Sequence, residues 1–326
     1  MPNLLTKQAY IDGVLSGDRV VLSRAITLVE SIHPEHEDMA QQVLAACLPH
    51  SGKSIRIGIT GVPGVGKSTF IEALGNAIIS QQNKKLAVLA IDPSSTASRG
   101  SILGDKTRMS TLSNNPNAYI RPTSSSGKLG GVAQRTREAI ILCEAAGFDT
   151  IFVETVGVGQ SETAVYQMVD FFLLLMLAGA GDELQGIKRG IMEMADAIVI
   201  NKADGDNINK AKLAVLQYKQ AAHLFVAKPS GWTPTVSACS ALSNSGINTI
   251  WDNIEIFEKA ARENGFFDTN RKNQNKYWFH ECINQLLLTR FYQTVAVKNQ
   301  LTQIETKVVL GEITPQTAAK TLIGLL

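Results

Sequence analysis

The sequence predicts an α/β fold in which a mostly parallel sheet is flanked by helices, with a helical extension at each end. Two observations carry this prediction. Short apolar runs rich in β-branched residues alternate with helical periodicity from about residue 54 to residue 264. On either side of this region, apolar residues recur at three- and four-residue spacing. We therefore expect three segments: a helical extension over 1–52, a central domain over 53–265 and a helical segment over 266–326.

The composition is that of an ordinary globular protein. The chain has 326 residues, of which 44% are hydrophobic and 18% are charged. Its 31 Lys and Arg residues against 29 Asp and Glu residues give a net charge of +2, so we expect no nucleic-acid partner. Four cysteines are scattered without C-x-x-C spacing, which indicates buried thiols in a reducing compartment and not a disulfide framework or zinc site.

The ends and the apolar runs indicate where the chain resides. The N-terminal residues lack the basic and then apolar pattern of a signal peptide. The longest apolar run, 171–178, is too short to span a bilayer and suits a buried parallel strand. We expect a cytoplasmic protein without a membrane partner.

The N-terminal extension, residues 1 to about 50, is predicted to be helical, with a second helix over 35–47. His33 and His36 are expected in the turn between the helices, as solvated residues, since no third metal ligand is near in the sequence.

The central region is expected to contain six strands and five helices. Ligands of such parallel sheets bind outside the carboxyl ends of the strands, so the residues that follow each strand are the candidates for function. The expected strands are 54–60, 86–91, 149–154, 170–177, 197–201 and 234–238, and the expected helices are 67–82, 130–146, 184–195, 207–222 and 246–264.

The first strand leads into a phosphate-binding pattern. Gly61, Gly66, Lys67 and Ser68 satisfy G-x-x-x-x-G-K-[ST] between a strand and a helix, which predicts a P-loop NTPase; a glycine-rich turn without a ligand is the alternative. Glycines let backbone N–H groups surround an anion at the positive end of the helix. Lys67 is expected to reach the β- and γ-phosphates and Ser68 to bind Mg²⁺. The expected phosphate-binding residues are Gly61, Val62, Pro63, Gly64, Val65, Gly66, Lys67, Ser68 and Thr69.

Carboxylates follow the next strands. Asp92 ends the second strand and is a candidate Mg²⁺ ligand, although Asp-Pro-Ser-Ser is also good turn chemistry. Asp105 and Arg108 lie in a long polar connection over 97–131, where they are candidates for a nucleotide-sensing loop or are solvated charges; we place Asp105 in the metal set. Glu154, at the end of the third strand, is expected to position the attacking water, with Lys67 as the second catalytic residue.

The loop over 179–190 carries glycines and four charged side chains after the fourth apolar strand. Its position next to the expected site suggests a third mobile element. An ordinary glycine-rich loop remains the alternative.

The guanine-reading pattern N-K-x-D follows the strand 197–201, as Asn201, Lys202 and Asp204. The Asp carboxylate of this pattern accepts from the ring N1–H and the exocyclic amine of guanine, whereas adenine would leave it unpaired, so GTP and GDP are the expected ligands. Ser240, Ala241 and Leu242 are expected to contact guanine O6, with Ser237-Ala238 as a competing register.

The C-terminal segment is expected to form a helix from Tyr277, a break at 298–300, a helix over 301–310 and a last helix that begins at Pro315. The polar stretch 268–275 is expected to precede the first of these helices. This apolar helical tail is expected to pack on a partner or a second copy of the chain; the alternative is that it folds back on its own domain.

Taken together, the motifs resemble those of the MeaB/ArgK family of P-loop GTPases, whose human relative is the methylmalonic aciduria type A protein. The resemblance begins with the helix SGDRVVLSRAITLVES at 16–31 and reaches the C-terminal tail. It is carried by GVPGVGKST at 61–69, AIDPSS at 90–95, GDKTRM at 104–109, FVETVGVGQSE at 152–162, LAGAGDELQGIKRGIME at 177–193 and NKAD at 201–204.

The resemblance implies a homodimeric GTPase that chaperones an adenosylcobalamin-dependent acyl-CoA mutase, such as methylmalonyl-CoA mutase. It implies that GTP hydrolysis gates cofactor loading and protects the mutase, that the loop over 177–188 signals to the mutase, and that C-terminal helices form the dimer. Two other functions compete. A metal-insertion GTPase is disfavoured by dispersed histidines and unpaired cysteines, and an ATP-dependent kinase linked to lysine, arginine and ornithine transport is disfavoured by the guanine-reading pattern.

Overall fold

The structure is a computed structural model of the chain, and it describes all residues except 1–3, 32, 93–108, 125–128, 156–160 and 180–188. It divides into two compact units, Met1–Lys272 and Asn273–Leu326. The three-segment division expected from the sequence stays a prediction.

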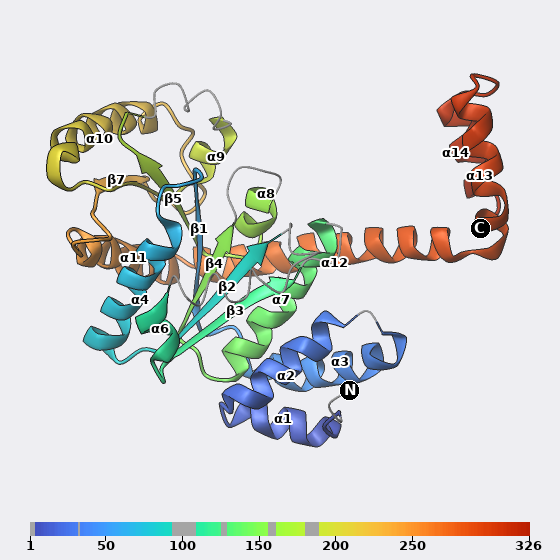
Figure 1. The fold of residues 1–326 in the computed structure, drawn as a ribbon, viewed down its shortest axis with the longest axis horizontal. Coiled ribbons are helices and arrows are strands. Elements are labelled where there is room, and N and C mark those ends of the chain that lie inside the picture. The colour runs from blue at the N-terminus through green and yellow to red at the C-terminus, as the bar shows by residue number, and fades with distance from the viewer. Residues whose placement is uncertain (1–3, 32, 93–108, 125–128, 156–160, 180–188) are drawn as a thin grey trace. The chain divides into compact units, whose positions relative to one another are not determined.

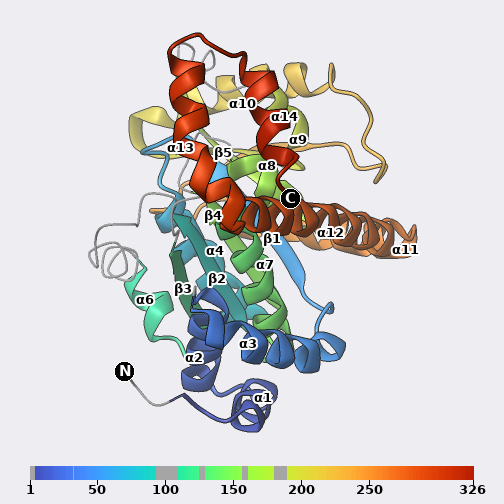
Figure 2. The ribbon, with the colours of Figure 1, turned by 90° about the vertical axis from the view of Figure 1, so that its right-hand side faces the viewer.

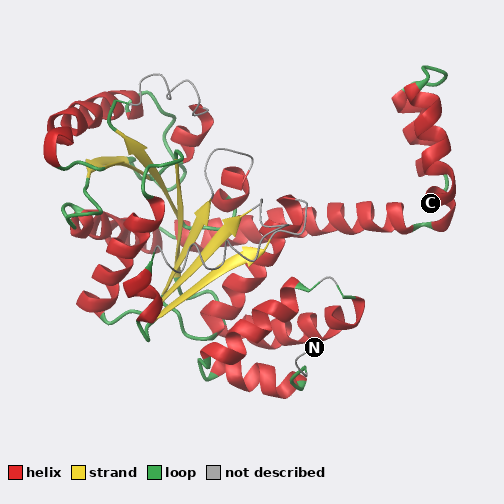
Figure 3. Cartoon of the chain, viewed as in Figure 1, coloured by secondary structure: helices red, strands yellow, loops and turns green. Residues whose placement is uncertain are grey.

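The centre of the first unit is a parallel sheet, which confirms the predicted α/β fold (Figures 1 and 3). Its described strands lie in the order β3-β2-β4-β1-β5-β6-β7. Strands β1, β4 and β6 are buried along their whole length, as expected for a parallel sheet that is covered on both faces. The strands are β1 (Ile55–Gly61), β2 (Leu86–Asp92), β3 (Ala118–Ser124), β4 (Thr150–Thr155), β5 (Phe171–Leu177), β6 (Ala197–Asn201) and β7 (Thr235–Ala238).

Helices cover both faces of this sheet (Figures 1 and 2). From β1 to β3 the chain steps along the sheet in one direction, and from β3 to β7 it steps back. Because crossovers are right-handed, the two directions place helices on opposite faces. Thus α4 contacts α6 and α11, whereas α7 contacts α8. The helices are α4 (Lys67–Gln82), α6 (Ser110–Asn114), α7 (Leu129–Ala145), α8 (Ser161–Tyr166), α9 (Arg189–Met194), α10 (Ile208–Ala222) and α11 (Ile247–Glu263).

Strand β3 and helix α6 were not expected, because both fall within the connection predicted over 97–131. The strand has the sequence AYIRPTS, in which only the first half is apolar. Pro122 cannot donate a ladder hydrogen bond on its nitrogen, and such a residue is tolerated at the edge of a sheet. Strand β3 is an edge strand that pairs with β2 alone among the described strands.

The described residues of the N-terminal extension form three helices, and its first part is divided at Gly17, which has φ 77°. The Asp18 carboxylate then accepts from the backbone N–H groups of Val20 and Val21 and so begins a new helix. The expectation that His36 lies in a turn is wrong, because Pro34 at the first helical position draws it into the following helix. The helices are α1 (Lys7–Leu15), α2 (Arg19–Glu30) and α3 (Pro34–Cys47), followed by the 3₁₀ turn η1 (Leu48–His50).

Helix α2 shields the exposed edge of the sheet. Arg121 of β3 forms an ion pair with Glu30, and its guanidinium also donates to the Thr27 hydroxyl at 3.1 Å and the Ser23 hydroxyl at 3.3 Å. These contacts fasten helix α2 to the edge strand β3.

A buried charge network joins four elements at the amino edge of the sheet. Arg56 of β1 donates through Nε and Nη2 to the two carboxylate oxygens of Glu144 in α7, at 2.8 Å each. Arg271 donates to both carboxylate oxygens of Asp170, directly before β5, and to Glu144 at 3.4 Å. Asp170 also accepts from the Arg56 backbone N–H at 2.8 Å. Two guanidinium groups and two carboxylates thus neutralise one another inside the protein.

The second unit is helical and has its own small core. Val297, Ile304, Ala318 and Leu322 are buried together. The break expected at 298–300 is wrong, because these residues lie within α13 and the chain turns instead at Thr294, which has extended backbone angles. The stretch 268–275, expected to precede a helix, is helical. The helices are α12 (Phe266–Gln293), which begins in the first unit, α13 (Val295–Val309) and α14 (Pro315–Ile323).

Among the described residues, none of the helices has the length and apolar character needed to cross a membrane.

Removal of the Glu144 charge should destabilise the first unit. Burial acts to raise the pKa of Glu144, but the Arg56 and Arg271 guanidinium groups outweigh it and hold the pKa below its ordinary value of 4.5. The carboxylate therefore stabilises the fold above that pH, and this contribution disappears as the pH falls through the folded-state pKa. We expect Glu144→Gln to lower the free energy of unfolding by about 3–5 kcal/mol at neutral pH, measured by urea denaturation, and to flatten its acid dependence.

The matched control is Glu258→Gln, which breaks the exposed Glu258–Arg262 pair one helical turn apart on α11. It should cost less than about 1 kcal/mol. Equal stability of Glu144→Gln and the unsubstituted protein at neutral pH would contradict the role given to the network.

Candidate functional site

The register of the parallel strands brings the sequence motifs to one edge of the sheet. Gly61 pairs with Leu175, and Ile59 of the same strand pairs with Glu154. On the other side of β5, Leu177 pairs with Asn201. The end of β1, the carboxylate on β4 and the amide on β6 therefore share the carboxyl edge, where ligands of parallel sheets bind.

The loop between β1 and α4 requires glycine at its key positions. A Cβ atom at Gly61 would lie 2.5 Å from the carbonyl oxygen of Leu175, so only glycine permits this approach of β1 to β5. Gly66 has φ 89° and caps the first turn of α4. Pro63 and Gly64 are exposed, whereas Val62 and Val65 are buried. The helix thus begins at Lys67 with its positive end at the loop.

The Lys67 ammonium group lies on the same loop. Its Nζ donates to the carbonyl oxygen of Gly61 at 2.9 Å and of Val62 at 3.5 Å. Burial lowers the pKa of Lys67, and the negative charges of Glu154 and Glu162 act in the opposite direction. Carbonyls and two acidic neighbours therefore hold the cation at the loop, where its ammonium group can pair with an anionic ligand.

Glu162 was not identified from the sequence. It lies in the first turn of α8 and is 1% exposed. It follows the motif that contains Glu154, but nothing in its spacing separates it from an ordinary helix-start carboxylate. Only the folded chain brings its charge to Lys67.

The Ser68 hydroxyl and the Glu154 carboxylate are neighbours. Ser68 Oγ lies 3.5 Å from Glu154 Oε1, and Glu154 is 8% exposed. Oxygen donors of this kind match the preference of Mg²⁺. Asp92 is the last residue of β2, and its side chain lies outside the described part of the structure; Asp105 and the loop over 180–188 also lie outside it. Thr69 is an exposed residue in the first turn of α4.

The Asn201 side chain connects the phosphate loop to the turn after β7. Its Nδ2 donates to the Val65 carbonyl at 2.8 Å, and its Oδ1 accepts from the Ala241 backbone N–H at 3.1 Å. Asn201 is 2% exposed. The amide therefore fixes the distance between two segments that lie far apart in the sequence but close together at this edge of the sheet.

The Asp204 carboxylate is oriented by the same turn. Ser240 Oγ donates to Asp204 Oδ2, and the Ser243 backbone N–H donates to Ser240 Oγ at 3.2 Å. Lys202 has the left-handed φ of 60°, and its carbonyl accepts from the Asn207 amide at 2.7 Å. The arrangement presents a fixed acceptor beside the phosphate loop, which suits a base with paired N–H donors.

The position of the Ser240–Leu242 turn differs from that of the competing register. Ser237 and Ala238 lie within β7, whereas Ala241 contacts the side chain of Asn201 at the end of β6 and Ser240 contacts that of Asp204 after it. The Leu242 side chain is 83% exposed.

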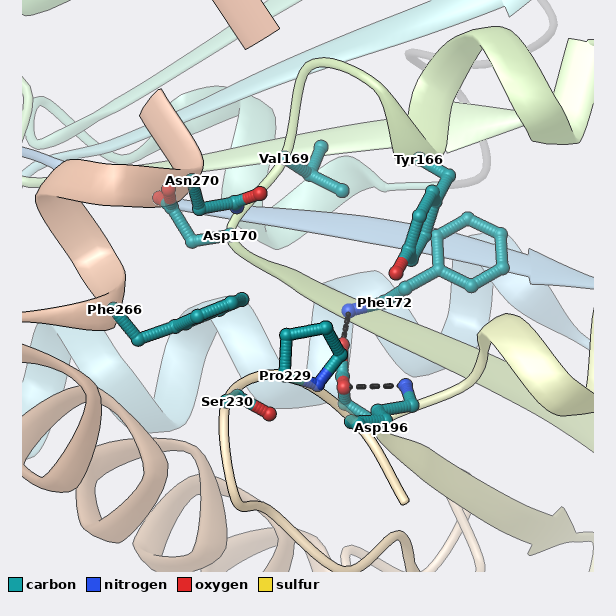
Figure 4. Close-up of a pocket in the computed structure, with 10 residues that line it drawn as sticks. Tyr166, Val169, Asp170, Phe172, Asp196, Pro229, Ser230, Phe266 and Asn270 are labelled. Carbon is teal, nitrogen blue, oxygen red and sulfur yellow. Dashed lines mark hydrogen bonds and ion pairs between the residues drawn. The ribbon is translucent and has the colours of Figure 1, made fainter. Parts of the chain in front are cut away.

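A small cavity lies at the opposite, amino edge of the sheet (Figure 4). Its volume of about 30 Å³ is enough for water but not for a nucleotide. The Asp196 carboxylate at its wall accepts from the Phe172 backbone N–H at 2.8 Å and from Lys228 Nζ at 2.6 Å. Burial raises the pKa of Asp196, and Lys228 only partly offsets this. The lining residues are Tyr166, Val169, Asp170, Phe172, Asp196, Lys228, Pro229, Ser230, Phe266 and Asn270.

Comparison with known proteins identifies a matching family and several relatives that align over most of their length. Residues 22–296 match the family described as "Methylmalonyl Co-A mutase-associated GTPase MeaB". A probable GTPase of Mycobacterium tuberculosis is 49% identical over 320 residues, covering 98% of this chain and 95% of its own. GTPase ArgK of Escherichia coli is 48% identical over 310 residues, covering 92% and 93%. The mitochondrial methylmalonic aciduria type A homolog of Mus musculus is 44% identical over 331 residues, covering 97% and 80%.

A solved structure is similar over the same length. The crystal structure of a protein described as "LAO/AO transport system kinase" has a TM-score of 0.78 and 38% sequence identity, and the match covers 99% of this chain and 98% of that one.

Loss of the Asn201 amide should loosen the phosphate loop. We expect Asn201→Ala to lower the free energy of unfolding by about 1–3 kcal/mol, because the Val65 carbonyl loses its donor in a buried environment. Hydrogen exchange of the backbone amides of Val62 and of residues 64–66 should become faster; Pro63 has no amide hydrogen. Asn207→Ala, which removes an exposed amide from the Lys202 carbonyl, is the control and should leave that exchange unchanged. Unchanged exchange in Asn201→Ala would show that the loop holds its conformation without this side chain.

Proposed function

This chain belongs to the MeaB family of methylmalonyl-CoA mutase-associated GTPases, and we propose that it hydrolyses GTP to gate the loading of an adenosylcobalamin-dependent acyl-CoA mutase. The observation that carries the nucleotide part is the Asn201 bridge. It holds the phosphate loop and the turn that orients Asp204 at a fixed separation, as a single ligand with a phosphate end and a guanine end requires. The mutase part is supported by family membership.

The proposed contacts with GTP follow from the site. The loop from Gly61 to Thr69 holds the phosphates through its backbone N–H groups, which every residue of it except Pro63 carries, and through the Lys67 ammonium. Asn201, Lys202 and Asp204 contact the base together with the turn from Ser240 to Leu242. Ser68, Asp92 and Asp105 are the proposed ligands of Mg²⁺. The Ser68 hydroxyl beside the Glu154 carboxylate supplies the oxygen donors that such an ion takes, and the ion would neutralise phosphate charge.

In the proposed reaction, a water molecule attacks the γ-phosphorus, the bond to the β–γ bridging oxygen breaks, and GDP and phosphate leave. Glu154 orients this water, and Lys67 stabilises charge on the phosphate oxygens. These residues position and neutralise but form no covalent bond with the substrate. A slow intrinsic rate is therefore expected until a partner completes the site.

The similar solved structure is described as that of a transport kinase, an activity that we do not extend to this chain. A kinase acting with ATP would leave the Asp204 carboxylate opposite an adenine edge without matching donors.

We also propose that the chain acts in the cytoplasm as a homodimer, and the second unit supports the dimer. The part of α12 after Asn273 exposes several large apolar side chains, and such a surface is typical of an interface between copies. Exposed fractions of 62% at Phe279 and 64% at Leu286 are too large for packing within the unit. The exposed set is Tyr277, Phe279, Ile283, Leu286, Leu287, Leu288 and Tyr292.

Substitution of Asp204 should change the nucleotide that drives the proposed function. In Asp204→Asn the amide donates where the carboxylate accepted, so guanine loses a partner and xanthine, which has a carbonyl at the same position, gains one. The assay measures adenosylcobalamin transfer to the purified apo-mutase with GTP and with xanthosine triphosphate. The unsubstituted protein should respond to GTP, and the variant should respond to xanthosine triphosphate with a preference reversed by about tenfold or more.

The control for this exchange is Asp206→Asn, an exposed carboxylate in the 3₁₀ turn η3 (Gly205–Asn207), which should keep the preference for GTP. If both proteins used GTP and xanthosine triphosphate equally, the guanine assignment would fail. If the protein preferred GTP but had no effect on the mutase, the assignment as a GTPase would stand and the proposed client would be refuted.

The dimer is tested by two substitutions on the exposed face of α12. Phe279→Asp combined with Leu286→Asp places two charges in an apolar interface, which should convert a dimer to a monomer in light scattering. Thr302→Asp on α13 introduces a charge at an exposed position of another helix and should leave the mass unchanged. A monomeric unsubstituted protein at micromolar concentration would refute the proposed dimer.

A further inference from the structure

The outward face of α10 exposes apolar side chains that its own packing does not explain. Ala211, Ala214 and Tyr218 are buried on the side that contacts β6 and β7. Leu213 and Leu216 lie on the opposite side and are 62% and 58% exposed. Just after the helix, Leu224 and Val226 are 78% and 89% exposed. Figure 1 shows α10 at the periphery of the first unit, next to β7.

Lysines surround these apolar side chains. Lys210, Lys212 and Lys219 are exposed, and none of them has an ion pair within the described residues. With about 100° between successive residues, Lys212 and Lys219 lie along one border of the Leu213–Leu216 strip and Lys210 lies along the other. We refer to these three lysines with Leu213, Leu216, Leu224 and Val226 as the α10 face.

The charge of the stretch that contains this face is one-sided, although the charge of the whole chain is nearly balanced. No Asp or Glu occurs between Asp206 and Asp252, whereas the full sequence has 29 acidic residues against 31 basic ones. On a solvated surface helix, lysines commonly alternate with acidic residues that neutralise them. Here the neutralising charge has to come from outside the helix.

We propose that the α10 face is a docking surface for the client mutase, whose complementary region has an apolar centre and carboxylates at its rim. The identity of this partner rests on the function proposed above, whereas the chemistry of its contact region follows from the face itself. An apolar strip bordered by like charges matches the general organisation of a protein interface, with a dry centre and a polar rim.

Other classes of partner fit this face less well. Nucleic-acid surfaces favour arginine and exposed aromatic side chains, and α10 has no arginine and buries its single tyrosine. Membrane-surface helices bury a broad apolar face in the lipid, but the broader apolar side of α10 is already packed on the sheet. The remaining strip is narrow and suits a shallow protein contact.

The position of α10 also links the face to the nucleotide site. The helix follows the guanine-reading segment after the turn η3, and the Asn207 side chain ties this turn to the Lys202 carbonyl at 2.7 Å. A client bound to α10 would therefore contact an element that begins beside the base. The α10 face shares no residue with the loop over 180–188 or with the exposed apolar set of α12.

The experiment measures the affinity of the full-length chain for purified methylmalonyl-CoA mutase by biolayer interferometry, at low and at high salt. We expect Leu213→Ser combined with Leu216→Ser to weaken binding by about tenfold or more, because the apolar centre of the interface is lost. Lys212→Glu combined with Lys219→Glu should slow association and reverse its salt dependence. Both variants should keep the GDP affinity of the unsubstituted protein, because their side chains point away from the sheet.

The matched control is Ile256→Ser combined with Lys259→Glu on α11, where Ile256 is 57% exposed. It should bind the mutase as the unsubstituted protein does. Equal binding by the α10 variants and this control would refute the docking surface while leaving the proposed function intact. Absence of binding by the unsubstituted protein would refute the proposed client and this inference together. Binding of the α10 face to phosphatidylglycerol vesicles, with mutase affinity unaffected by the variants, would assign it to a membrane instead.

Discussion

Two of the hydrogen bonds of the Asn201 side chain are the constraint on which the site depends. They join the Val65 carbonyl, in the loop after the first strand, to the Ala241 N–H after the last strand. A buried amide with both ends satisfied is rigid, because any rotation leaves a polar group unpaired. The loop and the turn are therefore held by one side chain, and the sheet between them sets its position. This bridge joins the two segments to which we assign the proposed phosphate and base contacts.

The two edges of the sheet perform different tasks. The carboxyl edge carries the loops, the acidic groups around Lys67 and the candidate nucleotide contacts. The amino edge carries the network of Arg56, Glu144, Asp170 and Arg271. Strand β1 reaches both edges within seven residues. The amino edge is thus fixed by charges that satisfy one another, whereas the carboxyl edge carries glycines in left-handed conformations that suit the binding of an anion.

Features encoded by local sequence were predictable, whereas features created by tertiary contacts were not. The phosphate loop was predictable because its backbone geometry requires glycine at positions 61 and 66. Glycines at this fixed spacing can be recognised in the sequence. Strand β3 was missed, since half of it is polar and its stability comes from pairing with β2 and from cover by α2. The proximity of Glu162 to Lys67 depends on how α8 packs, and no pattern in the sequence encodes it. The position of the break at Thr294 was not predictable either. It goes with the buried cluster of Val297, Ile304, Ala318 and Leu322, which forms only when α13 and α14 pack together.

The lysines of the α10 face have a consequence for how the molecule moves before any contact forms. A chain with a net charge of only +2 feels little overall force in the field of an acidic partner. Its acid-free stretch from residue 207 to residue 251 nevertheless separates positive from negative charge, which gives this part of the surface an electric dipole moment. The electric field of such a partner then mainly rotates the molecule and hardly attracts it. Rotational diffusion is therefore biased towards orientations in which α10 faces the partner at the first encounter.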